Sequence, residues 1–172
     1  MPYDEQFDQI MEIHTEQLFR IAYYYTKDLQ IAEDIVQDVF IKFYHHQKQY
    51  EERGELKAFL ARMTINKCKD YLKSWAYRKI TFQEKLFSKQ HTTSKDELIQ
   101  KDEQTIIGEA ILKLPIKQRE PIMYFYFEEM PIFEIAALLA IPESTVKSRL
   151  RRAKELLKID LQAIEWEELL ND

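Results

Sequence analysis

Glycine is almost missing from this chain, which has 2 glycines and 5 prolines among its 172 residues. Strands joined by tight turns need residues that accept positive φ angles, and glycine accepts them at the least steric cost. The shortage argues against a strand-and-turn fold. It favours an all-α protein whose helices are joined by short connections.

Cysteine is nearly absent as well. The single Cys68 can form neither a disulfide within the chain nor a cysteine-based zinc site. The 4 histidines show no metal-ligand spacing with cysteine or acidic partners, so no metal is predicted. The chain also has no glycine-rich phosphate loop and no nucleophile beside a matching base. We therefore expect a protein that needs no cofactor and is not an enzyme in its own right.

Long apolar runs are the third absence. No run approaches the ~18 residues needed to span a bilayer. The first residues, MPYDEQFDQIME, lack both the basic flank and the apolar core of a signal peptide. A lone cysteine fits a reducing compartment. We expect a soluble, cytoplasmic protein with no membrane insertion.

The charge of the chain is negative in sum but uneven in distribution. The net charge of -5 and the pI of about 5.5 discourage a nucleic-acid-binding interpretation when taken alone. Acidic residues gather at both ends, however, and basic residues gather in segments 57–79 and 147–158. Screening confines each charge's influence to roughly 10 Å at moderate salt, so local patches matter more than the sum. The two patches indicate two contact sites on one polymer, or one site in each of two domains.

Apolar residues recur at helical spacing through two parts of the chain. In the second expected helix they come in pairs every four residues, from Ile31/Ala32 to Phe43/Tyr44, which predicts a well-packed helix. A third helix is expected from about Leu56 to Trp75. We predict two small helical domains joined by a flexible linker. The segments are a first domain at 1–80, a linker at 81–105, a second domain at 106–160 and an acidic tail at 161–172.

The second domain contains the pattern of a helix-turn-helix. A short amphipathic helix over 131–139 is followed by a tight connector and a longer helix over 145–157. Spacing puts Val146, Leu150, Ala153 and Leu157 on one buried face of the longer helix. The opposite face carries hydroxyl and charged groups that suit DNA better than a purely solvated surface: Ser144, Lys147, Ser148, Arg151, Arg152 and Glu155.

Two further helices carry candidate surfaces. On residues 56–77, cationic groups, an amide and aromatic rings share the face opposite the packing residues. That combination suits an unstacked single strand, and a solvated surface with an edge aromatic is the open alternative. On the second helix, an acidic strip lies opposite the apolar pairs, and such strips usually just keep a helix soluble.

The sequence resembles a known family at four places. The segment EMPIFEIAALLAIPESTVKSRLRRAKELLK resembles the promoter-reading region of bacterial sigma factors, specifically the extracytoplasmic-function (ECF) group, and LPIKQREPIMYFYFEEM resembles the helices before it. AEDIVQDVFIKFY is similar to the group's polymerase-binding helix, and FLARMTINKCKDYL to its promoter-melting helix. The resemblance covers nearly the whole chain. It makes the first domain sigma region 2 and the second domain sigma region 4.

The resemblance implies a function and the residues that carry it. The chain would bind core RNA polymerase and direct promoter-specific transcription initiation, and an anti-sigma inhibitor would be a further partner. Minus-35 DNA would meet Ser144, Thr145, Lys147, Ser148, Arg151 and Arg152. Minus-10 DNA would be opened by Phe59, Arg62, Asn66, Lys69, Lys73 and Tyr77. The clamp helices of the largest polymerase subunit would bind Glu33, Asp34, Gln37 and Asp38.

The chain also departs from the family pattern. Ser144 stands where glycine is common and Ala140 where a turn glycine is frequent, while Pro131 and Phe133 replace hydroxyl and acidic residues. Phe59 stands where the family usually has tryptophan. The chief alternative is a free-standing helix-turn-helix transcriptional regulator whose first domain dimerises or senses a ligand. A nuclease is a more distant alternative, disfavoured because no acidic ligand cluster lies beside the basic patches.

Overall fold

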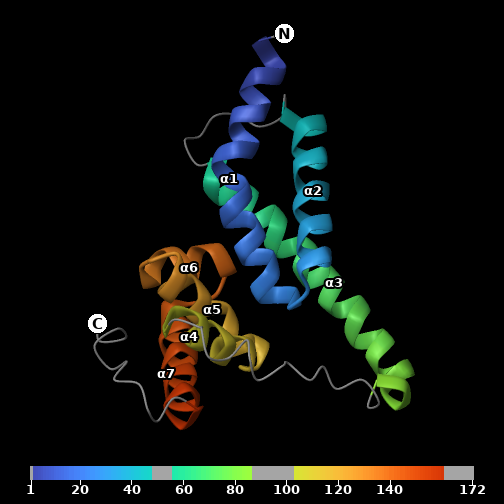
Figure 1. Ribbon diagram of the computed structural model, residues 1–172. Coiled ribbons are helices and arrows are strands. Elements are labelled where there is room, and N and C mark those ends of the chain that lie inside the picture. The colour runs from blue at the N-terminus through green and yellow to red at the C-terminus, as the bar shows by residue number, and fades with distance from the viewer. Residues whose placement is uncertain (1, 48–55, 87–102, 161–172) are drawn as a thin grey trace. The chain divides into compact units, whose positions relative to one another are not determined.

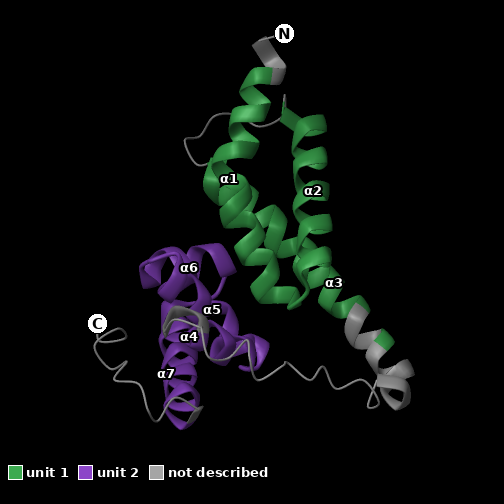
Figure 2. Ribbon diagram, viewed as in Figure 1, with its two compact units in different colours: residues 1–83 green, residues 84–172 purple. Residues whose placement is uncertain are grey.

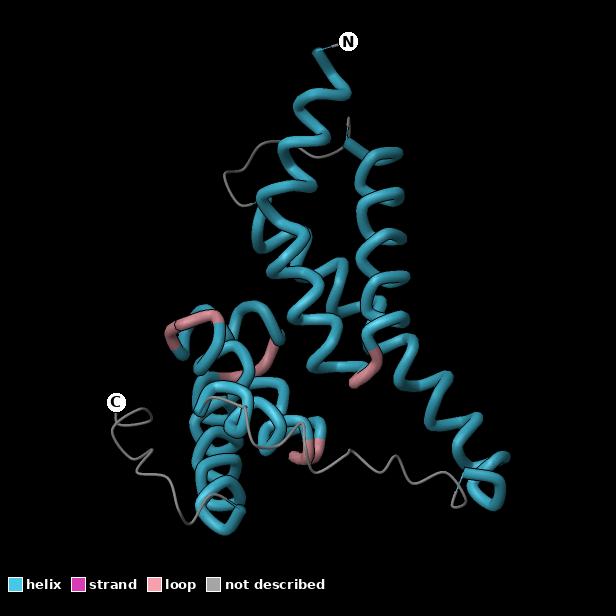
Figure 3. The backbone as a smooth tube through the Cα atoms, in the orientation of Figure 1, coloured by secondary structure: helices cyan, strands magenta, loops and turns pink. Residues whose placement is uncertain are grey.

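A computed structural model of the chain describes residues 2–47, 56–86 and 103–160. All regular structure in those ranges is helical (Figure 3), which confirms the predicted all-α class for them. The chain divides into two compact units, residues 1–83 and 84–172 (Figure 2). The helices in chain order are α1 (Pro2–Thr26), α2 (Leu29–His46), α3 (Leu56–Leu86), α4 (Glu103–Leu112), α5 (Ile116–Phe127), α6 (Ile132–Leu139) and α7 (Glu143–Asp160).

In the first unit, α1 and α2 pack against each other as an antiparallel pair joined by a short turn (Figure 1). Lys27 takes a positive φ of 59° in this turn. Asp28 then caps α2, because its Oδ1 accepts a hydrogen bond from the backbone N–H of Ile31 at 3.1 Å. The turn and this cap together fix where α2 begins. Leu18 and Ile21 of α1 are fully buried in the core that the two helices form.

The apolar pairs predicted for α2 form most of its packing face. The buried residues of this helix are Ala32, Ile35, Val36, Val39, Phe40 and Phe43. The prediction is wrong for the last member, Tyr44, whose side chain is 41% exposed. Its ring lies 5.0 Å from that of Phe7, near the N-terminal end of α1, where the helix pair offers only partial cover. The buried stripe therefore ends at Phe43.

α3 is longer than the sequence pattern indicated. It was expected to end near Trp75, but it continues to Leu86, into the segment assigned to the linker. No glycine or proline lies between residues 56 and 86, so nothing breaks the helix after its apolar pattern fades. Residues 87–102 of the predicted linker lie outside the described residues, and residues 103–105 belong to α4.

The N-terminal half of α3 completes the core of the first unit. Leu60 and Cys68 are fully buried, and so is Thr64, whose hydroxyl donates to the carbonyl of Leu60 at 2.9 Å. That bond satisfies a polar group that would otherwise be costly to bury. Burial raises the pKa of the Cys68 thiol to about 12, so this side chain stays protonated in the core.

In the second unit, α4, α5 and α6 all pack against α7 (Figure 1). Pro121 lies buried inside α5, and the helix continues past it. Arg119 on the same helix is also buried, and its Nε and Nη2 both donate to the carbonyl of Leu114 at 3.2 Å. Of the four aromatic residues at 124–127, Tyr124 is fully buried and the other three are half-buried.

The connection between α6 and α7 is a tight turn with a left-handed residue. Ala140 has φ 54° and ψ 44°, and the next amide, that of Ile141, donates to the carbonyl of Ala136 at 3.1 Å. This is the position where a glycine is frequent, because the Cβ of any other residue is sterically disfavoured at a positive φ. The turn completes the predicted helix-turn-helix.

Among the described residues, no helix combines the length and apolar character needed to cross a membrane.

Candidate functional sites

The exposed face of α7 carries the residues predicted to meet minus-35 DNA. Val146, Leu150, Ala153 and Leu157 are buried against the rest of the unit, as predicted from their spacing. Thr145 is half-buried beside them. The other predicted contact residues are all exposed: Ser144, Lys147, Ser148, Arg151 and Arg152.

Two of these side chains are held by short-range bonds. The Ser148 hydroxyl donates to the carbonyl of Thr145 at 3.0 Å. The Arg152 Nη1 donates to Glu155 Oε2 at 3.1 Å. The Ser148 hydroxyl oxygen remains available as an acceptor, and the guanidinium keeps its other N–H groups for further partners. α7 therefore presents both prearranged and unconstrained polar groups.

Lys154 belongs to α7 but not to this face. Its Nζ lies 5.6 Å from the ring centroid of Phe125 on α5, a cation–π distance. Burial lowers the pKa of this lysine, in keeping with a side chain packed between helices. The basic segment at 147–158 thus splits into an outward group and an inward-packing lysine.

On α3, the predicted minus-10 residues share the face opposite the core. Arg62, Asn66 and Lys73 are exposed, and Lys69 is half-buried. Phe59 lies at the border, 36% exposed, with its ring 6.2 Å from that of Phe43 on α2. The side chain of Tyr77 lies outside the described residues, so the structure places the other five residues only.

The acidic strip of α2 is exposed. Its predicted docking residues are Glu33, Asp34, Gln37 and Asp38, and all four are exposed on the face away from the buried stripe. The Asp34 Oδ1 accepts a hydrogen bond from Gln30 Nε2 at 3.1 Å, which orients that carboxylate along the helix.

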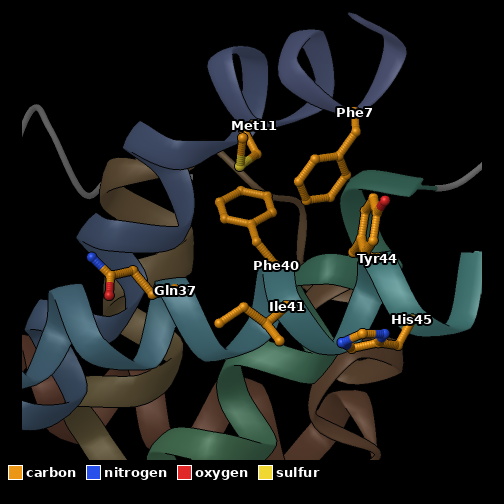
Figure 4. A pocket seen from close by; sticks show the side chains of 7 residues that line it. All are labelled: Phe7, Met11, Gln37, Phe40, Ile41, Tyr44 and His45. Carbon is orange, nitrogen blue, oxygen red and sulfur yellow. The ribbon is translucent and has the colours of Figure 1, made fainter. Parts of the chain in front are cut away.

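An apolar groove that the sequence patterns did not predict lies beside this strip (Figure 4). It has a volume of about 480 Å³. The rings of Phe7, on α1, and of Phe40 and Tyr44, on α2, form its aromatic wall (Figure 4). Ile41 is 56% exposed at its edge and was the available sequence signal, because it is an aliphatic residue outside the apolar pairs of α2. The remaining lining residues are Met11, Gln37 and His45.

Gln37 belongs to both features, so the groove and the acidic strip form one continuous surface. The groove side is apolar and the strip side is negatively charged. A partner that covers both must combine an apolar side chain with basic groups.

Within the described ranges, no group of three or more His, Cys, Asp or Glu side chains is placed to hold a metal ion.

Comparison with known proteins assigns both units to one family. A model of "Sigma-70 region 2" matches residues 10–78, and a model of "Sigma-70, region 4" matches residues 104–157. The first model covers α2 and most of α3, and the second covers the helix-turn-helix. A free-standing helix-turn-helix regulator is not favoured, because region 2 is present as well.

Curated relatives match this chain over most of their own length. The ECF RNA polymerase sigma factor SigW of Bacillus subtilis is 26% identical over 168 residues, which cover 92% of this chain and 90% of the relative. The ECF RNA polymerase sigma factor SigM of Mycobacterium tuberculosis is 25% identical over 159 residues, which cover 88% of this chain and 74% of the relative.

Two solved structures share the fold. The sigma factor RpoE of Bartonella quintana, in complex with the anti-sigma factor NepR, matches with a TM-score of 0.69 and 22% identity, over 92% of this chain and 98% of that chain. CnrH, in complex with the cytosolic domain of CnrY, matches with a TM-score of 0.66 and 22% identity, over 93% of this chain and 90% of that chain. Two family models in the order expected for a sigma factor, with ECF relatives matched over most of their length, lead to one conclusion: this chain belongs to the sigma-70 family and is a sigma factor of the ECF group.

Proposed function

We propose that this sigma factor divides promoter recognition between its two units. The first unit docks on core RNA polymerase and opens the minus-10 element, and the second unit reads the minus-35 element. The observation that carries the proposal is that the predicted contact residues whose side chains are described are exposed, opposite a buried stripe, except for the half-buried Thr145 and Lys69 and for Phe59, which lies at the border and is 36% exposed. Such faces are free to bind without disturbing the core.

In the second unit, α7 would lie in the major groove. Ser144 and Thr145 at its start allow close approach, while Lys147 and Arg151 reach phosphates. Contacts to phosphate position the helix, and contacts to base edges give the sequence preference. Ser148 and Arg152, each already fixed by a hydrogen bond, suit base readout better than the unconstrained cations do.

In the first unit, α3 would receive the separated strand. Arg62, Lys69 and Lys73 follow the backbone, Asn66 reads the edge of an extruded base, and Phe59 offers its ring as a stacking surface. Stacking on an aromatic ring offsets part of the energy lost when a base leaves the duplex. The role proposed for Tyr77 rests on the family resemblance alone, because its side chain lies outside the described residues.

The polymerase would meet α2. The acidic strip supplies charge complementary to a basic partner, which speeds encounter and fixes register more than it adds affinity. We place an apolar side chain of the same polymerase partner in the adjoining groove, because strip and groove are continuous through Gln37. Burial of apolar area there would supply affinity that the charges do not.

The proposed setting is the cytoplasm, where polymerase and promoter meet. A proposed further partner is an anti-sigma factor, because the RpoE structure named above is a complex with the anti-sigma factor NepR. An inhibitor that covers the α2 surface would compete directly with polymerase.

The net negative charge gives the proposal a physical corollary. Repulsion from phosphate opposes the local basic patches, so the isolated chain should bind duplex DNA weakly and depend on polymerase.

Run-off transcription with purified core enzyme and a promoter library tests the function. The chain should confer start-site selection on core enzyme that lacks any sigma factor. A variant with Asp34→Lys and Asp38→Lys should lose that activity, while Glu134→Lys in the second unit should bind core normally. If core enzyme neither captures the chain nor gains start-site selection, the proposal fails.

A further inference from the structure

Arg152 and Glu155 form a salt bridge on the outer face of α7. The Arg152 Nη1 lies 3.1 Å from Glu155 Oε2, and the two side chains are 58% and 56% exposed. An exposed pair three residues apart on a helix contributes little to folding stability. Its visible effect is on the guanidinium itself, whose Nη1 is turned toward Glu155.

The bond leaves most of the guanidinium unused. Arginine carries five N–H donors in a rigid planar fork, and this bond engages one terminal nitrogen, Nη1. The edge formed by Nε and Nη2 takes no part in it. That edge can donate to two acceptors side by side, the arrangement of O6 and N7 on guanine in the major groove.

The neighbouring cations of the same face differ in this respect. Lys147 and Arg151 are exposed, and neither has an ion pair among the described residues of the second unit. An unconstrained cation can meet a phosphate from many directions, whereas a base edge accepts a donor pair from few. The restrained Arg152 is therefore the better candidate for reading a base.

The negative charge of Glu155 also favours base reading over phosphate binding by this pair. A carboxylate beside the guanidinium opposes attraction to phosphate in general, because its charge is the same as that of the DNA backbone. The pair therefore lowers affinity for unselected DNA and keeps a directional contact. The salt bridge therefore favours selectivity among DNA sequences over tight binding to any sequence.

We propose that Glu155 is a positioning residue that holds Arg152 for a two-point contact with a guanine edge, and so sets the base preference at one position of the DNA element read by α7. This rests on the proposed function, because it takes α7 as the helix that enters the major groove.

Holoenzyme, made from core polymerase and the full chain, provides the test. It is incubated with duplex DNA whose minus-35 segment is randomised, and the retained DNA is sequenced to give the base preference at each position. Variants are Arg152→Ala, Glu155→Ala and Glu155→Gln, with Glu134→Ala as the control for loss of an exposed carboxylate on the preceding helix. Binding to core polymerase and the helical content are measured for each, and exposed side chains should leave both unchanged.

The expected pattern is specific to one position. Arg152→Ala should abolish a guanine preference that the unsubstituted chain shows, and Glu155→Ala should lower the same preference about three- to tenfold while retention of unselected DNA rises. Glu155→Gln should keep most of the preference, because its amide oxygen still accepts from Nη1. Glu134→Ala should leave it intact.

Three results would overturn the proposal, each for a different reason. If Arg152→Ala weakens retention without altering any base preference, Arg152 contacts phosphate only. If Glu155→Ala raises retention equally for all sequences, Glu155 merely masks charge. If holoenzyme with the unsubstituted chain enriches no sequence at all, the proposed promoter-reading function itself has failed.

Discussion

The ring of Phe59 on α3 lies 6.2 Å from the ring of Phe43 on α2, at a tilt of 60°. Phe43 is buried in the core, while Phe59 remains 36% exposed. The proposed stacking surface for an extruded base is thus supported from beneath by the helix that carries the proposed polymerase-docking strip. The proposed surfaces for polymerase binding and for DNA opening thus lie on two helices that contact each other.

Replacing Phe59 by leucine should impair promoter opening without loss of polymerase binding. Leucine keeps an apolar contact with Phe43 but has no π-face, and stacking of a base on an aromatic ring contributes ~1–3 kcal/mol. Open-complex formation, measured by permanganate reactivity of unpaired thymines, should fall about tenfold. Phe59→Trp, which restores an aromatic face, should retain activity. Equal activity of the leucine variant would show that Phe59 does not stack on a base.

Helical periodicity was sufficient to predict the faces of α7. Val146, Leu150 and Leu157 follow the helix repeat, so their burial and the exposure of Arg151 and Arg152 could be read from spacing alone. The same logic identified the exposed strip of α2. Local pattern was enough in both cases, because each face is set by a single helix.

Features that depend on more than one helix were missed. Tyr44 was placed in the packed stripe, but α1 covers it only in part, and the groove beside it exists only because Phe7 comes from another helix. The end of α3 was placed near Trp75 because the apolar pattern fades there. A helix continues until something stops it, however, and residues 76–86 contain no breaker.

Replacing Ala140 by glycine should stabilise the second unit. The residue has a φ of 54°, which costs an alanine ~1 kcal/mol that glycine avoids. Amide hydrogen exchange in α6 and α7 should slow by about fivefold, the factor that corresponds to ~1 kcal/mol. Ala137→Gly, at an exposed position inside α6, is the matched control and should speed exchange by a similar factor. If both substitutions destabilise the unit, the left-handed turn is not a source of strain.

Replacing Ile41 by asparagine should weaken binding to core polymerase. Ile41 is 56% exposed, so the change removes apolar area from the groove edge without opening the core. A loss of ~1 kcal/mol of apolar burial predicts about a fivefold rise in Kd. The change should appear mainly in the dissociation rate, measured by surface plasmon resonance. Ile13→Asn is the control, because Ile13 is 70% exposed on α1 and does not line the groove. Equal effects of the two substitutions would remove the groove from the interface.

The stability of the first unit should fall in alkaline solution because of Cys68. Burial raises the pKa of this thiol from 9.0 to about 12, and it can ionise near 9.0 once the chain unfolds. Above that pH the unfolded state has released a proton that the folded state still holds. The free energy of unfolding should therefore decrease by ~1.4 kcal/mol per pH unit from this group until the folded pKa is reached, and the contribution is fully present below pH 9.0.

Urea unfolding of the chain and of a Cys68→Ala variant between pH 9.0 and about 12 measures this slope. The variant should be less stable at neutral pH, because the substitution leaves unfilled space in the core, but it should lack this component of the alkaline decline. Folded protein should also react slowly with iodoacetamide at mildly alkaline pH and rapidly once urea is added, since the thiolate is the reactive form. Rapid labelling of the folded chain, or the same pH slope in both proteins, would mean that Cys68 is not held protonated in the core.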